Sequence, residues 1–170
     1  MSIKNCYPSF PEVPYVKTSI DMASIVVYAK TLIGEHFPKE VVKAAYCIFR
    51  NESANGKSGV NNNYIGLQAD NAKWEGLDLT NVVGTCVKKD GANEVRRFIA
   101  FNENGYKASF SFLCYKVQQR GIYISATGVN NADDLAEAYQ KKWVSNPPED
   151  TPAARKDFKS LYNSANTVFG

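Results

Sequence analysis

The 170 residues of this chain are enough for one domain with one hydrophobic core, because at that size roughly 70% of the unfolded surface is buried on folding. Apolar residues make up 44% of the chain and charged residues 22%, as in ordinary globular proteins. The 20 Lys and Arg residues and 17 Asp and Glu residues are scattered along the chain, which excludes the clustered positive charge that nucleic-acid binding needs.

The N-terminal segment MSIKNCYPSFPEVPYVK has no continuous apolar run, and no other stretch approaches the apolar length of a membrane span. We therefore expect synthesis in the cytoplasm without a signal peptide, and no membrane insertion. The cysteines Cys6, Cys47, Cys86 and Cys114 form neither a CxxC pair nor a Cys/His cluster. They are predicted to be reduced core thiols, with no metal and no other cofactor.

In chain order, residues 1–17 contain three prolines and predict an extended lead-in that drapes over the domain. Ser19 is predicted to cap a helix with apolar residues at near-helical spacing over 20–33, and Gly34 to end it. Pro38 then fits the first turn of a second helix over 39–52. The next segment, 53–66, is rich in Gly, Asn and Ser, so we expect a loop from which no core can be built.

The second half of the chain begins with two β-rich runs, 82–87 and 94–101, which flank Asp90-Gly91 and predict a hairpin. Helices are expected over 109–120, closed by Gly121, and from the Asn131 cap to Trp143. A final helix is expected in the C-terminal segment 151–170, with Thr151 and Pro152 at its start. The fold class predicted for residues 1–170 is a single mainly helical α+β domain with a small β-hairpin.

Glu52 is the most informative residue, because the apolar stripe of the helix over 39–52 places its carboxyl group on the inward face. Partial burial disfavours the ionised form of a carboxyl group, and a general acid must hold its proton near neutral pH. The alternative is a glutamate that turns to solvent or pairs with Arg50 or Lys57. Spacing alone does not separate the two.

The segment FRNESANGKSGVNNNYIGLQAD, residues 49–70, resembles the lysozyme-like superfamily of peptidoglycan hydrolases. In goose-type lysozymes and lytic transglycosylases a helix ends in the catalytic Glu, and a small-residue loop and a Gly-hydrophobic-Gln stretch follow. The segment from Trp74 to Gly121 is similar to the autolysin-type glucosaminidases, with a Trp-x-Gly sequence followed by a hairpin. The resemblance covers residues 38–145 and implies a lysozyme-like domain.

The resemblance implies that Glu52 donates a proton to the glycosidic oxygen, while Asn63, Gly66 and Gln68 shape the floor of a sugar-binding groove. A glycine also allows close approach of the backbone to a sugar. Two aromatic groove residues are predicted as well: Tyr64, which lies in the loop itself, and Tyr139, which resembles a tyrosine that closes over the catalytic Glu in this superfamily. From the residues alone, Asn61 to Asn63 also fit a plain solvated turn.

Glycoside hydrolysis usually needs a second carboxylate. Asp70 matches the Asp that positions the attacking water in goose-type lysozymes, although it also fits a cap of the segment before Trp74. The glucosaminidases instead place a second Glu in the hairpin, where this chain has Thr85-Cys86-Val87-Lys88. Weaker stand-ins for the second carboxylate are Glu75, Asp78 and Glu94.

The expected function is a bacteriolytic hydrolase that cleaves the β-1,4 bonds between N-acetylmuramic acid and N-acetylglucosamine in peptidoglycan. Delivery to the cell wall would require a phage particle, a secretion apparatus or lysis, with a carrier or immunity protein as a possible partner. The alternative is an inactive lysozyme-like module that binds glycan or protein. His36 is the only histidine and is expected on the surface, which argues against a Ser/His or Cys/His catalytic pair.

Overall fold

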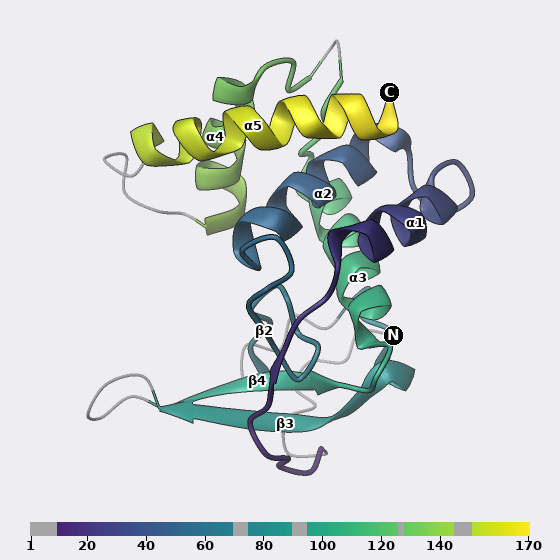
Figure 1. Cartoon of the computed structure of the whole chain (residues 1–170), viewed down its shortest axis with the longest axis vertical. Coiled ribbons are helices and arrows are strands. Elements are labelled where there is room, and N and C mark those ends of the chain that lie inside the picture. The colour runs from purple at the N-terminus through teal and green to yellow at the C-terminus, as the bar shows by residue number, and fades with distance from the viewer. Residues whose placement is uncertain (1–9, 70–74, 90–94, 126–127, 145–150) are drawn as a thin grey trace. The chain divides into compact units, whose positions relative to one another are not determined.

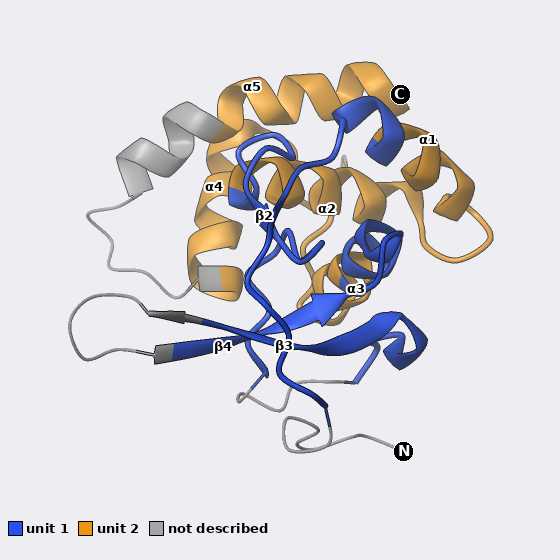
Figure 2. Cartoon of the chain, turned by 60° about the horizontal axis from the view of Figure 1, so that its bottom comes forward, with its two compact units in different colours: residues 1–25, 52–112 blue, residues 26–51, 113–170 orange. Residues whose placement is uncertain are grey.

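The computed structural model describes residues 10–69, 75–89, 95–125, 128–144 and 151–170 (Figure 1). The chain divides into two compact units, which Figure 2 shows in different colours. Unit 1 comprises residues 1–25 and 52–112, and unit 2 comprises residues 26–51 and 113–170. Helices dominate and the strands pair antiparallel, so the predicted mainly helical α+β class is confirmed. No helix in the described part of the chain is long and apolar enough to cross a membrane.

Unit 1 contains a β-hairpin. Strand β3 (Val82–Lys89) pairs antiparallel with β4 (Val95–Phe101), and the register is irregular between Val82 and Gly84. The hairpin predicted from the two β-rich runs is therefore confirmed. Residues 90–94, which include the predicted turn, lie outside the described residues.

Segments without regular structure extend both edges of this hairpin. On the β3 edge, the Val13 amide donates to the Thr85 carbonyl (2.7 Å), and the Thr85 amide donates to the Pro11 carbonyl (2.8 Å). On the β4 edge, the Ile99 amide donates to the Leu67 carbonyl (3.0 Å). The described part of the lead-in is thus hydrogen-bonded to the β3 edge of the hairpin; residues 1–9 are outside the described range.

The loop after the second helix contributes to the core of unit 1, so the expectation that it could not was wrong. Its short strand β2 (Gly59–Val60) pairs antiparallel with β1 (Lys17–Thr18). Ser53 is fully buried and the Tyr64 side chain is only 2% exposed. Hydrogen bonds to backbone groups order this segment, which leaves its few apolar side chains free to fill the interior.

Helix α1 (Met22–Leu32) starts later than predicted. Asp21, and not Ser19, caps it: the Ala23 amide donates to Asp21 Oδ1 at 2.9 Å. The amide of Ile20 is engaged by the Gly56 carbonyl (2.8 Å), so the chain is still extended where Ser19 would have begun the helix. Gly34 follows the helix with a φ of 87°, the left-handed conformation that was predicted for it.

Helix α2 (Lys39–Glu52) is buried more completely than an amphipathic stripe predicts. Every residue from Val41 to Phe49 is buried, including Lys43, and the carbonyl of Pro38 accepts from the Val41 amide (3.1 Å) in the first turn. Only residues near the two ends of the helix are therefore accessible to solvent, and Glu52, its last residue, is half-buried.

The remaining helices follow the predicted order. Helix α3 (Gly105–Gln119) begins four residues before the predicted Ser109, because the Gly105 amide already bonds the Asn102 carbonyl (2.8 Å). Helix α4 (Ala132–Tyr139) is capped as predicted, since Asn131 Oδ1 accepts from the Asp134 amide (2.8 Å). A π-helical turn (Gln140–Val144) extends α4, and α5 (Thr151–Phe169) completes unit 2.

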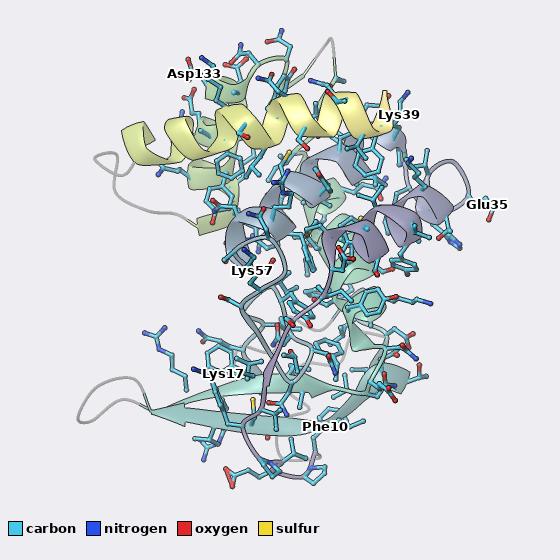
Figure 3. All side chains as sticks on the ribbon, viewed as in Figure 1. Phe10, Lys17, Glu35, Lys39, Lys57 and Asp133 are labelled. Atoms are coloured by element: carbon cyan, nitrogen blue, oxygen red, sulfur yellow. The ribbon has the colours of Figure 1, made fainter. Side chains whose placement is uncertain are left out.

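The cysteines that the structure describes are free thiols. Cys47, Cys86 and Cys114 are all fully buried, which confirms the prediction of reduced core thiols for these three. Cys6 lies outside the described residues. His36 is exposed in the connection between α1 and α2, where Figure 3 labels its neighbour Glu35.

Candidate functional site

A pocket of ≈180 Å³ in unit 1 brings together four of the residues predicted to form the site. These four are Glu52, Asn63, Tyr64 and Gly66. The complete described lining is Tyr15, Glu52, Ser58, Val60, Asn63, Tyr64, Gly66 and Phe98. Of these residues, Glu52 alone carries a carboxyl group. The pocket therefore places one half-buried acid among aromatic and small polar groups.

Glu52 ends α2, and the next residue determines how the chain leaves the helix. The Ser53 hydroxyl accepts from the Gly56 amide (2.9 Å), and the Ser53 carbonyl accepts from the Ser58 amide (2.8 Å). Ala54 and Asn55 within this turn are left-handed, with φ angles of 49° and 60°. This tight turn returns the chain toward the end of the helix, so that Ser58 lines the same pocket as Glu52.

Asn63 supports the pocket from within. Its Nδ2 donates to the carbonyls of Leu67 (2.9 Å) and Ile99 (3.1 Å), and its Oδ1 accepts from the amides of Ile65 (3.3 Å) and Leu67 (3.1 Å). An amide group has two donors and two good acceptor positions, and all four are engaged here. Asn63 therefore shapes the pocket by holding its backbone.

The two asparagines before it form the tip of a tight turn. Asn61 and Asn62 have φ angles of 48° and 61°, and the amide and carbonyl of Val60 both bond with those of Asn63. Two consecutive left-handed residues are the signature of a type I′ hairpin turn, which favours Asn. The plain-turn interpretation is correct for the backbone of Asn61 and Asn62, and their side chains also bond to other segments of unit 1.

Gly66 and Tyr64 form different parts of the wall. Gly66 has a φ of 64°, and the direction in which a Cβ would point is open. Tyr64 is buried, with its ring against Gly59, where an added Cβ would overlap it. Burial raises the pKa of the Tyr64 phenol, and a hydrogen bond with the Thr18 side chain lowers it by less. Tyr64 therefore lines the pocket with very little exposed surface.

Four lining residues were not predicted from the sequence: Tyr15, Ser58, Val60 and Phe98. Tyr15 belongs to the lead-in and Phe98 to β4, both far from Glu52 in the sequence. No local pattern marks them, because only the pairing of distant segments brings them together. Both side chains are half-buried, so their rings are partly accessible.

Three predicted residues are not placed in this pocket. Gln68 forms an isolated antiparallel β-bridge with Phe98 and is not among the described residues that line the pocket. Tyr139 belongs to unit 2, where its hydroxyl accepts from Asn51 Nδ2 (3.1 Å) and its ring packs on Phe158 with centroids 4.8 Å apart. Asp70 lies outside the described residues.

The weaker candidates for a second carboxylate are also located. Asp78 caps a short 3-10 helix (Leu79–Asn81): its Oδ1 accepts from the Thr80 amide (3.0 Å) and hydroxyl (2.6 Å). Glu75 is exposed, and Glu94 is outside the described residues. Among the described residues, no cluster of three His, Cys, Asp or Glu side chains could hold a metal ion.

Comparison of the chain with models of protein families, with curated proteins and with solved structures finds no match. The resemblance to the lysozyme-like superfamily therefore stays a prediction that depends on the sequence motif.

Proposed function

We propose that this protein is a glycosidase that degrades peptidoglycan, cleaving the β-1,4 bonds between N-acetylmuramic acid and N-acetylglucosamine with Glu52 as general acid. The observation that carries the proposal is the pocket in unit 1, whose lining combines Glu52 with Asn63, Tyr64 and Gly66. The resemblance assigns Glu52, Asn63 and Gly66 to the site, and Tyr64 is the aromatic residue predicted from the loop itself. Glu52 supplies the carboxyl group that protonation of a glycosidic oxygen requires.

In the proposed reaction Glu52 protonates the leaving oxygen while the sugar develops oxocarbenium character. The aromatic lining residues Tyr15 and Phe98 offer apolar surface for a pyranose ring. Asp70 is the proposed second carboxylate and would orient water for hydrolysis. Attack by the 6-hydroxyl of the muramic acid, which needs no second carboxylate, would instead give the anhydro-sugar of a lytic transglycosylase.

The proposed activity requires that the protein reaches the cell wall. The substrate is the glycan strand of a bacterial wall, and bacteriolysis is the expected outcome. Delivery by a phage particle, a secretion apparatus or lysis is part of the proposal, as is an accompanying carrier or immunity protein. Gln68 and Tyr139 are proposed as substrate-binding residues on the resemblance alone.

The test is product analysis of purified peptidoglycan by mass spectrometry after incubation with wild type, Glu52→Gln and Glu103→Gln. Glu103 is an exposed glutamate of unit 1, which makes its amide variant a matched control. Soluble muropeptides should form with wild type and Glu103→Gln, and about 10²- to 10⁴-fold more slowly with Glu52→Gln. The reducing ends of the products identify the cleaved bond and separate hydrolysis from transglycosylation.

The second candidate is a lysozyme-like module that binds glycan or protein without turnover. It is favoured by one observation, that Glu52 is the sole carboxylate in the described lining. Such a module would bind glycan strands with the same affinity in wild type and Glu52→Gln and release no product. Absence of product from the wild type on several wall types, with binding retained, would decide for this candidate and against the enzyme.

A further inference from the structure

The described part of the N-terminal lead-in, from Phe10 onward, bonds to several elements of unit 1. Pro11 and Val13 bond to Thr85 of β3, and Lys17 pairs with Val60 of β2, which lines the pocket. Just beyond the lead-in, the Ile20 amide donates to the Gly56 carbonyl. Figure 3 labels Phe10 and Lys17, which mark the two ends of the segment that crosses the hairpin. The segment thus runs from β3 to β2 across unit 1.

Asn61 holds the middle of this segment. Its Oδ1 accepts from the Val16 amide (3.0 Å), its Nδ2 donates to the Pro14 carbonyl (3.0 Å), and its own amide donates to the Val16 carbonyl (2.8 Å). These bonds engage the residue before Tyr15 and the residue after it. The backbone on both sides of Tyr15 is therefore held by one residue of the 53–66 loop.

The orientation of Tyr15 follows from this attachment. Side chains alternate between the two faces of an extended chain. Pro14 and Val16 are exposed, Val16 by 50%, whereas Tyr15 is half-buried and lines the pocket. The ring of Tyr15 thus forms part of the wall of the pocket that contains Glu52.

We propose that Tyr15 is a sugar-binding residue of this pocket and that Asn61 is the positioning residue that holds it there. A partly accessible ring can stack on the apolar face of a pyranose, and its hydroxyl can bond to the ring substituents. The buried ring of Tyr64 cannot take this role, because it is covered by Gly59. The inference rests on the proposed function, since it takes the occupant of the pocket to be a glycan.

The first test measures the dissociation constant for soluble glycan strands, prepared from peptidoglycan by removal of the stem peptides. Calorimetry in the Glu52→Gln background prevents cleavage. Adding Tyr15→Ala should weaken binding about tenfold, whereas Tyr15→Phe, which keeps the ring, should stay within about threefold. The control is Tyr162→Ala, which removes another half-buried tyrosine from α5 in unit 2 and should leave affinity unchanged.

The second test separates positioning from general stability. Asn61→Gly keeps the left-handed backbone and removes the side-chain bonds to Pro14 and Val16. Asn62→Gly is the matched control: it has the same backbone conformation, but its side chain bonds to the Asn102 carbonyl (2.7 Å) instead of the lead-in. In otherwise wild-type protein, Asn61→Gly should raise the KM for glycan strands several-fold with kcat unchanged. Asn62→Gly should leave KM unchanged.

The two tests can overturn the roles of Tyr15 and Asn61 separately. Equal affinity with and without Tyr15→Ala overturns the inference, and leaves the proposed function standing if the wild type still releases muropeptides. Equal KM effects of Asn61→Gly and Asn62→Gly overturn the positioning role. Absence of glycan binding by the Glu52→Gln parent also overturns the inference, while product formation by the wild type tests the proposed function separately.

Discussion

Replacement of Asn63 by Ala is expected to be the most destabilising single change in the pocket of unit 1. The side chain is 5% exposed and bonds to four backbone groups, at distances of 2.9–3.3 Å. Alanine removes all four bonds, and its side chain has no group that can replace them. Because Asn63 is buried, the backbone groups that lose its side chain gain little contact with water in exchange.

The size of the effect follows from the number of bonds. A buried hydrogen bond contributes about 1 kcal/mol net, and an abandoned buried polar group costs about 1–3 kcal/mol. Four bonds at about 1 kcal/mol each therefore predict a loss of about 4 kcal/mol, which is a large part of a typical stability of about 5–15 kcal/mol. Asn63→Asp should also destabilise at pH 7, because a carboxylate oxygen would then face the carbonyls of Leu67 and Ile99.

The assay is urea unfolding followed by far-UV circular dichroism and by tyrosine and tryptophan fluorescence. Asn163→Ala is the control, because Asn163 is exposed on α5 and its replacement should change stability by less than about 0.5 kcal/mol. A loss below about 1 kcal/mol for Asn63→Ala would refute the reasoning, since it would mean that the four bonds do not hold the 63–67 turn.

Two further predictions concern packing and the buried thiols. Gly59→Ala should destabilise by about 1–3 kcal/mol in thermal unfolding, because the added Cβ overlaps the ring of Tyr64; an unchanged midpoint would contradict the contact. Burial raises the pKa of the Cys47 thiol from its ordinary value of 9.0 to about 12. Since the unfolded chain loses this proton first, the resulting stability is complete below pH 9 and is lost between about pH 9 and 12, on the order of 1 kcal/mol per pH unit. Alkaline unfolding profiles of wild type and Cys47→Ala that run parallel in this range would show the attribution to be wrong.

Features with a local physical cause were predictable from the sequence. The hairpin over β3 and β4 follows from two β-rich runs, and the Asn131 cap from its place before Asp133 and Asp134. Glu52 was predicted at the end of an apolar helix, and it lies there, half-buried. Periodicity and capping act over a few residues, so a single stretch of sequence contains the whole signal.

The helix starts show where local signals compete. Ser19 and Asp21 are both good cap residues. Asp21 caps the helix because the amide of the intervening Ile20 bonds to the Gly56 carbonyl, which keeps the chain extended at Ser19. Similarly, α3 begins at Gly105 because the chain already turns at Asn102. Each boundary depended on a partner that the local pattern does not contain.

By itself, the sequence determined the fold class, the order of the main helices and the hairpin, the buried character of the three described thiols and the position of Glu52 at a helix end. Only the tertiary structure decided that a loop rich in Gly, Asn and Ser becomes part of the core of unit 1 and that Tyr15 joins Glu52 in one pocket. The physical reason is that the order of this loop comes from hydrogen bonds to distant backbone groups, through Asn61 and Asn63. The composition shows only that such asparagines are polar. The backbone groups to which they bond come close to them only when the chain has folded.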